Sequence, residues 1–265
     1  MLTDTIGVGI IAYNRPEYLK WTLLTLENQE LSGNCDFHFF LDGAASTPAK
    51  PLVYQSKQLF EISSLHNKHK HIREKNAGIA QNQLDARDYL SKNYSHFIIV
   101  EDDVVLSKYA IRVLRVLADH INNRVFSAGI SFIKKGNKLD QCFYHNSEHW
   151  WCELYSSKNW QAVRPYFMQY YQLVKDVNYK MRDHKKIRDF YSDNSFPERR
   201  TSQDSGVDFS LFKSDMRRVT TSVNRGMYIG IEGTHFNEQL AEKYHFNDQV
   251  PYQFESDATI KRFTL

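Results

Sequence analysis

The stretch HFIIVEDDVVL, residues 96–106, combines a strand pattern with a cluster of acids. Its apolar residues 97–100 run directly into Glu101, Asp102 and Asp103. A short apolar run with β-branched residues is typical of a strand buried on both faces. Three carboxylates at its end cannot be buried without partners, because an isolated ionised carboxylate in an apolar interior is very costly. The strand is therefore expected to end where a cation or water meets it.

In an open α/β sheet, ligands bind in the crevice at the carboxyl ends of the strands, where these acids would lie. Adjacent carboxylates suit a hard divalent cation such as Mg²⁺ or Mn²⁺, and such ions also bind phosphate oxygens. The alternative is a solvated acidic turn, because short acidic motifs are weak signals. The stretch thus predicts either a metal-assisted phosphate site or a turn in water.

Length and composition restrict the class of protein. A chain of 265 residues fits one large α/β domain or two small ones. The formal net charge of +3 gives no argument for nucleic-acid binding. There is no apolar run of about 18 residues and no signal-peptide pattern, so we expect a cytoplasmic protein. The cysteines, Cys35, Cys142 and Cys152, lack CxxC spacing, which is typical of a reduced protein without a disulfide framework or zinc site.

Strand and helix patterns alternate through the first half of the chain. Strand patterns lie at 6–12, 35–41, 97–100 and 125–132, and helical patterns near 17–24, 51–65, 81–90 and 108–122. This alternation predicts a mostly parallel, doubly wound sheet that resembles a nucleotide-binding half-domain. The absence of GxGxxG and GxxxxGK[ST] argues against a dinucleotide dehydrogenase and a P-loop NTPase. The basic stretch HNKHKHIREKN at 66–76 is interpreted as a solvated segment.

Two turns in this half offer groups to a ligand. Asn14 or one of its neighbours is a candidate cap for the helix whose first turn holds Pro16. The same helix N-terminus has free N–H groups for an anion, and Arg15 adds a planar guanidinium for phosphate or carboxylate. Gly78 either permits close approach of the backbone to a ligand or merely shapes a turn.

The second half of the chain has a different composition. Aromatic residues gather between 149 and 171, as core or as a platform for a sugar ring. The charged residues of 175–201 predict either a solvated amphipathic helix or a mobile arm. A helix that begins near Ser202 or Asp204 would place Asp204 and Asp208 on one face, because they are four residues apart.

Several segments occur in the order found in GT-A nucleotide-sugar glycosyltransferases: IIAYNRPEYLKWTL (10–23), VEDDVV (100–105), HWW (149–151), GVDFSLF (206–212) and GIEGTHF (230–236). Over about residues 6–240 the chain resembles the inverting N-acetylglucosaminyltransferase I family and its smaller bacterial relatives. The resemblance implies an α/β GT-A fold with a Rossmann-like, doubly wound, mostly parallel sheet. Residues 1–135 would form the nucleotide-sugar-binding half. Residues 136–265 would form the half of the same domain that binds the acceptor and carries the catalytic base.

The resemblance also implies roles for individual residues. Asp103, the last acid of the Glu-Asp-Asp motif, is similar to the family's metal-contacting carboxylate, and His235 to a histidine that approaches the metal or diphosphate. Arg15 is similar to the arginine that reaches the nucleotide diphosphate, and Asp42 stands where the family has an acid that contacts uracil. Further contacts to the nucleotide sugar are implied for Ala12, Asn14, Asn76, Gly78, Glu101 and Asp102.

The catalytic base of the family is an Asp in an aromatic–Asp pair at the start of a helix. Asp208 is the preferred match, although Val207 replaces the expected tryptophan, and Asp204 is the other candidate. An acceptor hydroxyl needs such a base because its pKa lies far above neutral. The departing nucleotide diphosphate needs a cation, which a divalent metal on Asp103 would supply.

Together these features predict a metal-dependent, inverting glycosyltransferase of polysaccharide biosynthesis. It would move a sugar, with GlcNAc as one candidate, from a UDP-sugar to a hydroxyl of a glycan or lipid-linked glycan, with Mn²⁺ or Mg²⁺ as cofactor. The basic arm would allow peripheral contact with a membrane surface. Two alternatives stay open: a sugar nucleotidyltransferase, whose glycine- and lysine-rich signature is absent, and a non-catalytic sugar-nucleotide-binding protein with a degenerate site.

Overall fold

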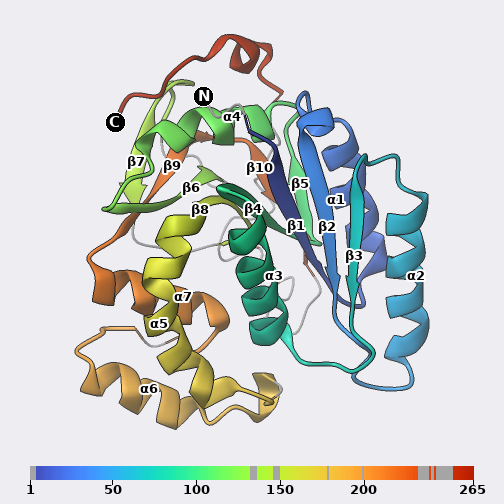
Figure 1. Ribbon diagram of the computed structural model, residues 1–265, viewed down its shortest axis with the longest axis vertical. Helices are drawn as coiled ribbons and strands as arrows, with labels where there is room; N and C mark the ends of the chain where they lie inside the picture. Colours follow the sequence, from blue (N-terminus) through green and yellow to red (C-terminus); the bar gives the residue numbers. More distant parts are fainter. Residues whose placement is uncertain are drawn as a thin grey trace.

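The computed structural model describes residues 4–131, 136–145, 150–177, 179–198, 200–231, 239, 242 and 253–265. In this part of the chain, eight strands form one mixed sheet in the order β3-β2-β1-β4-β8-β6-β9-β7 (Figure 1). The strands are β1 (Ile6–Ala12), β2 (Cys35–Leu41), β3 (Lys68–Ile72), β4 (His96–Glu101), β6 (Val125–Ser131), β7 (Cys142–His145), β8 (Cys152–Ser156) and β9 (Arg217–Asn224). Two short strands, β5 (Val104–Leu106) and β10 (Gly226–Tyr228), pair antiparallel beside it.

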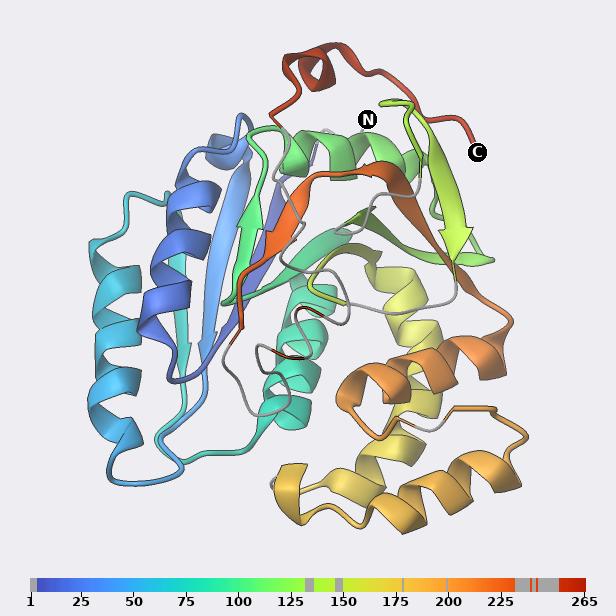
Figure 2. The same cartoon turned by 180° about the vertical axis from the view of Figure 1, so that it is seen from behind.

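Helices cover both faces of the sheet. They are α1 (Pro16–Glu27), α2 (Ala49–Ile62), α3 (Ile79–Asn93), α4 (Ala110–Leu117), α5 (Ser157–Val174), α6 (His184–Asp193) and α7 (Gln203–Ser214). Apolar residues of α1, α2 and α4 form one buried cluster with one face of the sheet, and those of α3, α5, α6 and α7 form another with the opposite face. Figures 1 and 2 show α1 and α3 on opposite sides of β1. The sheet is therefore buried on both sides, as its apolar strands require.

The first half of the sheet is parallel, because each of its strands is followed by a crossover helix. β1 pairs parallel with both β2 and β4, and β2 pairs parallel with β3. The strand order thus reverses between β1 and β4, which makes the carboxyl ends of these two strands a topological switch point. The predicted α/β fold with a mostly parallel sheet is confirmed.

The second half of the sheet is mixed. β8 runs antiparallel to both β4 and β6, β6 pairs parallel with β9, and β7 is an antiparallel edge strand. The helix predicted from Ser202 or Asp204 is α7, and Ser202 is its cap because its side chain accepts from the N–H of Ser205. α1 begins after Arg15, and no side chain caps its first turn, so the candidate cap role of Asn14 is wrong.

Both charged stretches of the sequence form regular structure. Residues 68–72 of the basic stretch form edge strand β3, whose side chains are all at least partly exposed. Lysines on an edge strand discourage pairing with another chain. Within 175–201 the structure contains helix α6, with Ile187 and Tyr191 fully buried, as the amphipathic-helix alternative predicts.

The aromatic residues between 149 and 171 are mainly core. Trp150 and Tyr170 have no exposed surface, and Trp151 and Tyr171 are nearly as buried. They therefore cannot serve as an open platform for a sugar ring. The three cysteines are also buried and free.

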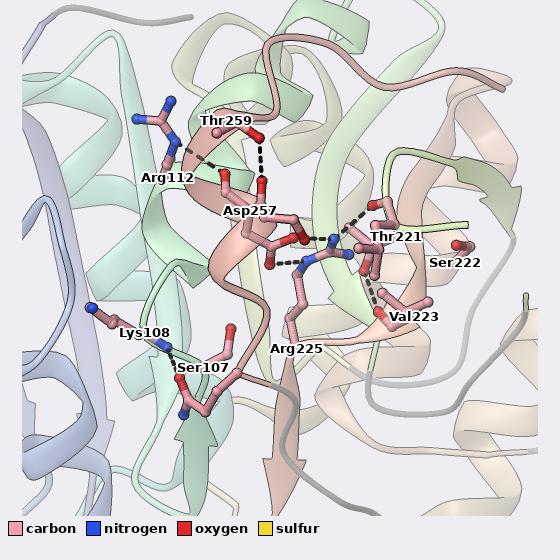
Figure 3. Close-up of polar contacts among 12 residues, drawn as sticks. Ser107, Lys108, Arg112, Thr221, Ser222, Val223, Arg225, Asp257 and Thr259 are labelled. Atoms are coloured by element: carbon pink, nitrogen blue, oxygen red, sulfur yellow. Dashed lines mark hydrogen bonds and ion pairs between the residues drawn. The ribbon is translucent and has the colours of Figure 1, made fainter. Parts of the chain in front are cut away.

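The C-terminal segment crosses the end of the molecule beside α4 (Figures 1 and 2). Its 3₁₀ helix, η5 (Glu255–Thr259), places Asp257 against Arg225, which lies between β9 and β10. Figure 3 shows this ion pair with Arg112 beside it, whose Nε donates to the carbonyl oxygen of Asp257. Among the described residues, no helix has the length and apolarity needed to cross a membrane.

Candidate functional site

The acids at the end of β4 meet a cation from the end of β1. The guanidinium of Arg15 pairs with Asp102, and its Nη1 lies 2.6 Å from Oδ2 of Asp103. The backbone N–H of Tyr13 donates a further hydrogen bond to Asp102, at 3.2 Å. Both aspartates are almost completely buried, at 2% and 1% exposure, which excludes the solvated turn. We call Arg15, Asp102 and Asp103 the acid–arginine cluster.

The segment that follows β10 completes the surroundings of Asp103. The hydroxyl of Tyr228 hydrogen bonds the Asp103 carboxylate, and the N–H of Ile229 donates to the Asp103 carbonyl oxygen at 2.9 Å. A Cβ atom at Gly230 would collide with Oδ2 of Asp103, so only glycine fits there. Tyr228 also stacks on Trp151, with ring centroids 4.3 Å apart. The sequence marked this stretch only as rich in glycine, and nothing in its spacing pointed to Asp103.

One oxygen of Asp103 has no bonding partner. Its Oδ1 is buried and lacks a hydrogen bond from any described residue, whereas Oδ2 contacts Arg15. Burial raises the pKa of Asp103 to about 6, although the neighbouring Arg15 acts in the opposite direction. Oδ1 is therefore the oxygen of Asp103 that Arg15 and the other described residues leave without a bond.

Asp42 organises the loop that leads into α3. Its Oδ1 accepts from the N–H groups of Gly43 and Ala77, and its Oδ2 from Gly78 N–H and the Asn76 side-chain amide, at 2.8–3.0 Å. The structure therefore brings Asp42, Asn76 and Gly78 together, and their contact with a nucleotide stays a prediction. Gly78 has a φ of 82°, a conformation that disfavours other residues.

The strand that carries Asp42 is tied to β1 at the same level. The N–H of Asp42 donates to the carbonyl oxygen of Ala12, the last residue of β1, at 3.1 Å. Asn14 lies in the turn between Ala12 and α1. The predicted nucleotide-contacting residues thus come from the carboxyl ends of adjacent parallel strands.

Glu101 connects β4 with the second half of the chain. Its Oε1 accepts from the side-chain amide of Gln83 on α3 at 2.7 Å. Burial, together with the negative charges of Asp204 and Asp103, raises the pKa of Glu101 well above its usual range. Burial also raises the pKa of Asp204, which lies in the first turn of α7. The two halves of the predicted site therefore meet where α7 approaches the end of β4.

Asp208 lies one turn further along α7. It is 7% exposed, and its Oδ2 accepts from Nη2 of Arg200 at 3.2 Å. Its Oδ1 is buried without a hydrogen bond from the described residues. Burial raises the pKa of Asp208 to about 7, even though Arg218 and Arg200 favour the carboxylate.

Asp208 also forms part of the wall of a pocket of about 870 Å³, here called the Asp208 pocket. α7, β7, the loop after α6 and the start of β9 contribute its lining: Tyr144, His145, Phe196, Pro197, Glu198, Arg200, Asp208, Leu211, Phe212, Asp215, Met216 and Arg217. The acid–arginine cluster does not line this pocket. His235, the other predicted metal ligand, lies outside the described residues.

Few side chains in the described residues could bind a metal ion. In the described part of the chain, no three His, Cys, Asp or Glu side chains are grouped to hold a metal ion. Mg²⁺, however, is commonly held by one or two carboxylates together with substrate phosphates and water. The unpartnered, buried Oδ1 of Asp103 fits that mode of binding, and a fully protein-made metal cage is not present in these residues.

Comparison with known proteins gives a structural likeness. No protein-family model matches the sequence, and no curated protein matches it. The structure of S. aureus TarS 1–349 in complex with UDP-GlcNAc is similar, with a TM-score of 0.54 and 13% sequence identity over 87% of this chain. The chain has a GT-A-like glycosyltransferase fold.

That likeness concerns the fold and not the activity, given the low identity. The chain spans 60% of the TarS chain that it matches. The mannosyltransferase PcManGT from Pyrobaculum calidifontis, in complex with GDP-Man and Mn²⁺, is a more distant match. Its TM-score is 0.44 and its identity 12%, over 63% of this chain and 53% of that one. The narrower resemblance to N-acetylglucosaminyltransferase I stays a prediction.

Proposed function

We propose that this protein is a glycosyltransferase that moves a sugar from a nucleotide-sugar donor to a hydroxyl group of a glycan. The observation that carries the proposal is the acid–arginine cluster, which is buried at the switch point between β1 and β4. Ligands of open α/β sheets bind in the crevice at this position. The similar fold of TarS, a protein crystallised with UDP-GlcNAc, supports a UDP-sugar as donor, with GlcNAc as one candidate sugar.

The loop that Asp42 organises is proposed to bind the nucleoside. Both Asp42 oxygens already accept hydrogen bonds from this loop, so its main contribution is to hold Asn76 and Gly78 in place. Arg15 precedes α1, and its side chain is 29% exposed. It therefore contacts the two aspartates on one side and has a second side that is open to solvent. That side and the free N–H groups of the α1 N-terminus would stabilise the diphosphate.

A divalent metal would be held by Asp103 through its unpartnered Oδ1, with phosphate oxygens and water as the other ligands. Bound Mg²⁺ or Mn²⁺ would act as a Lewis acid that neutralises the charge on the departing diphosphate. The contacts of Arg15 and Tyr228 with the Asp103 carboxylate support this proposal, because they hold the carboxylate in place and leave Oδ1 unbonded.

Asp208 is the proposed general base. The acceptor oxygen would attack the anomeric carbon as the bond from that carbon to the diphosphate oxygen breaks, and the hydroxyl proton would pass to Asp208. A single in-line attack of this kind inverts the anomeric configuration. Asp208 is preferred over Asp204 because it lines an open pocket, whereas Asp204 lies close to Glu101 and to the end of β4. A pKa of about 7 suits a base that works near neutral pH.

The test is release of UDP from a panel of UDP-sugars in the presence of Mn²⁺. We expect slow hydrolysis of at least one donor, loss of this hydrolysis in EDTA, and loss in the Asp103→Asn variant. Asp193→Asn, which changes an exposed acid on α6, is the matched control and should retain the wild-type rate. Tight UDP binding without turnover of any donor, even with glycans added, would instead indicate a degenerate sugar-nucleotide-binding protein.

A further inference from the structure

We infer that the Asp208 pocket binds the acceptor as an uncharged oligosaccharide, which it holds against Tyr144 and Phe212. This inference deepens the proposed function, since it assigns the class of acceptor and the side chains that recognise it. It rests on four features of the pocket: its size, its exposed aromatic rings, its charge and the carboxylate in its wall.

The size of the pocket exceeds what one sugar ring needs. Small-molecule pockets typically measure about 300–1,000 Å³. The volume of about 870 Å³ lies near the upper end, which suits two or three linked sugar rings. The pocket is lined from both α7 and the β7–β9 edge of the sheet, so a glycan chain entering it would contact two separate elements.

Two of the lining aromatic rings are unusually exposed. Tyr144 on β7 is 45% exposed and Phe212 on α7 is 47% exposed, in contrast to the buried Trp150 and Tyr170. Phe196 lies against Phe212, with ring centroids 5.2 Å apart, so the two rings form a continuous apolar wall. The face of an aromatic ring carries negative partial charge and attracts the weakly positive C–H groups of a sugar ring. Exposed rings inside a pocket therefore favour a saccharide as ligand.

The charges of the pocket disfavour an anionic acceptor. Its carboxylates are Glu198, Asp208 and Asp215, whereas its cations are Arg200 and Arg217. Arg200 already contacts both Glu198 and Asp208, at 3.2 Å from the latter. The guanidinium of Arg217 lies over the ring of Tyr144, 5.6 Å from its centroid. A phosphate or carboxylate on the ligand would meet surplus negative charge and cations that already have partners, and like charges brought together cost affinity.

Sugar hydroxyls, in contrast, match this lining. A hydroxyl donates to a carboxylate and accepts from a guanidinium, so it can bind beside paired charges without breaking them. Asp208 is the one buried carboxylate in the wall, and its unpartnered Oδ1 is available for such a hydrogen bond once a hydroxyl reaches it. The acceptor hydroxyl that reacts would be the one next to Asp208.

The inference is tested by saturation-transfer NMR without any nucleotide. The probes are four neutral disaccharides, lactose, cellobiose, maltose and mannobiose, and their 6′-phosphates. We expect at least one neutral disaccharide to bind and its phosphate to bind at least several-fold more weakly. Tyr144→Ala and Phe212→Ala should each weaken binding roughly tenfold, which corresponds to loss of one ring contact of about 1.4 kcal/mol. Tyr144→Phe retains the ring and should bind like the wild type.

The matched control is Tyr54→Ala, because Tyr54 is 59% exposed on α2 and does not line the pocket. It should leave disaccharide binding unchanged. The inference is wrong if the phosphates bind as well as the neutral sugars, if both ring deletions have no effect, or if no neutral disaccharide binds. If UDP-sugars are hydrolysed in these cases, the proposed function survives without this pocket. If disaccharides bind as expected but no donor is turned over, it is the proposed function that fails.

Discussion

Asp204 and Asp208 show how one helix turn separates two acids into different surroundings. Both lie on α7, and burial raises the pKa of each. Asp204 lies near Glu101, whose pKa it raises, whereas Asp208 forms part of the wall of an open pocket. Sequence spacing placed both acids on one face of a helix but could not distinguish them, because only the opposing elements differ.

Replacing Asp208 with Asn removes the proposed base and little volume. We expect the rate of sugar transfer to fall by about 10²–10⁴-fold, the usual contribution of one general base. The affinity for UDP should not change, because the acid–arginine cluster does not line the Asp208 pocket. Transfer kinetics and UDP calorimetry on the same preparations measure both. Asp193→Asn, which changes an exposed acid on α6 that does not line the pocket, is the control; a comparable loss in Asp204→Asn alone would move the base to Asp204.

The pH profile of transfer gives a second prediction at this scale. Burial raises the pKa of Asp208 to about 7, so the carboxylate is protonated and inactive as a base below that pH. The kcat/KM of the wild type should therefore rise with pH and level off above about 7. A profile that is already flat from pH 5 upward would show that the base is a carboxylate with an ordinary pKa.

The charged residues of the candidate site could be identified from the sequence, but the contacts between them could not. The Glu-Asp-Asp motif and Arg15 stood out because charge next to an apolar strand is unusual. That Arg15 pairs with both aspartates depends on β1 and β4 being neighbours. Tyr228 and Gly230 were missed as site residues, because about 125 residues separate them from Asp103 and no local pattern connects the two segments.

At the scale of elements, the C-terminal 3₁₀ helix holds the segment between β9 and β10. Arg225 and Asp257 form a two-point ion pair, with distances of 2.7 and 2.8 Å, and neither side chain has exposed surface (Figure 3). The carbonyl oxygen of Arg225 also accepts from the N–H of Ser107 beside β5. Because Tyr228 follows on β10, this pair fixes the strand that reaches Asp103.

Asp257→Ala should lower the free energy of unfolding by about 3–5 kcal/mol, because it leaves the Arg225 guanidinium buried without its partner. Glu255→Ala is the matched control in the same 3₁₀ helix. The Glu255 side chain is 74% exposed, so its loss should cost less than about 1 kcal/mol. Urea denaturation of both variants decides the matter: equal losses would mean that the buried pair has no special role.

Whether an element could be predicted from the sequence depends on how it packs in the sheet. The sequence predicts the strands and helices of the first half except β3 and β5, because strands buried on both faces have continuous apolar patterns. The helix predicted at 108–122 is divided into α4 and a 3₁₀ helix, Ala118–His120. The sequence KHKHI of β3 predicts only a solvated segment, because an exposed edge strand needs no apolar run. The short strands β7 and β8 were not predicted, because 4 and 5 residues are too few to establish a period.

For the whole molecule, one sheet joins the two predicted halves. β6 lies before residue 135, yet it pairs with β8 and β9 from beyond that position. α7 carries Asp204 toward the end of β4 from the same second half. The division of labour, with the donor in 1–135 and the acceptor in 136–265, stays a prediction. The shared sheet means that neither half would be expected to fold alone.

The far edge of this sheet carries a histidine cluster that should affect stability. His38 on β2 is 1% exposed; its Nδ1 lies 3.1 Å from Nε2 of His71, and its Nε2 lies 2.7 Å from the Tyr94 hydroxyl. The titratable groups around it are Asp36, His69, His71, Tyr89 and Tyr94. Burial, with the neighbouring histidines, lowers the pKa of His38 to about 4.

Between the unfolded pKa of about 6.5 and this folded value, the unfolded chain binds a proton that the native protein does not. Stability should therefore fall as pH decreases from about 6.5 to about 4, by up to about 1.4 kcal/mol per pH unit from this group. The raised pKa values of the buried acids change stability with pH in the opposite direction. The effect of His38 is therefore isolated by comparing the wild type with His38→Gln. Urea denaturation across this range should give a shallower decline in the variant; parallel curves would show that His38 does not titrate as described.

The claim on which the function depends is that Asp103 holds a metal that binds a nucleotide diphosphate. Calorimetric titration of UDP into the wild type and Asp103→Asn, with and without Mn²⁺, tests it most directly. The account predicts that Mn²⁺ strengthens UDP binding to the wild type at least roughly tenfold, or about 1.4 kcal/mol, and has no such effect on the variant. Equal UDP affinities for the two proteins in Mn²⁺ would contradict it.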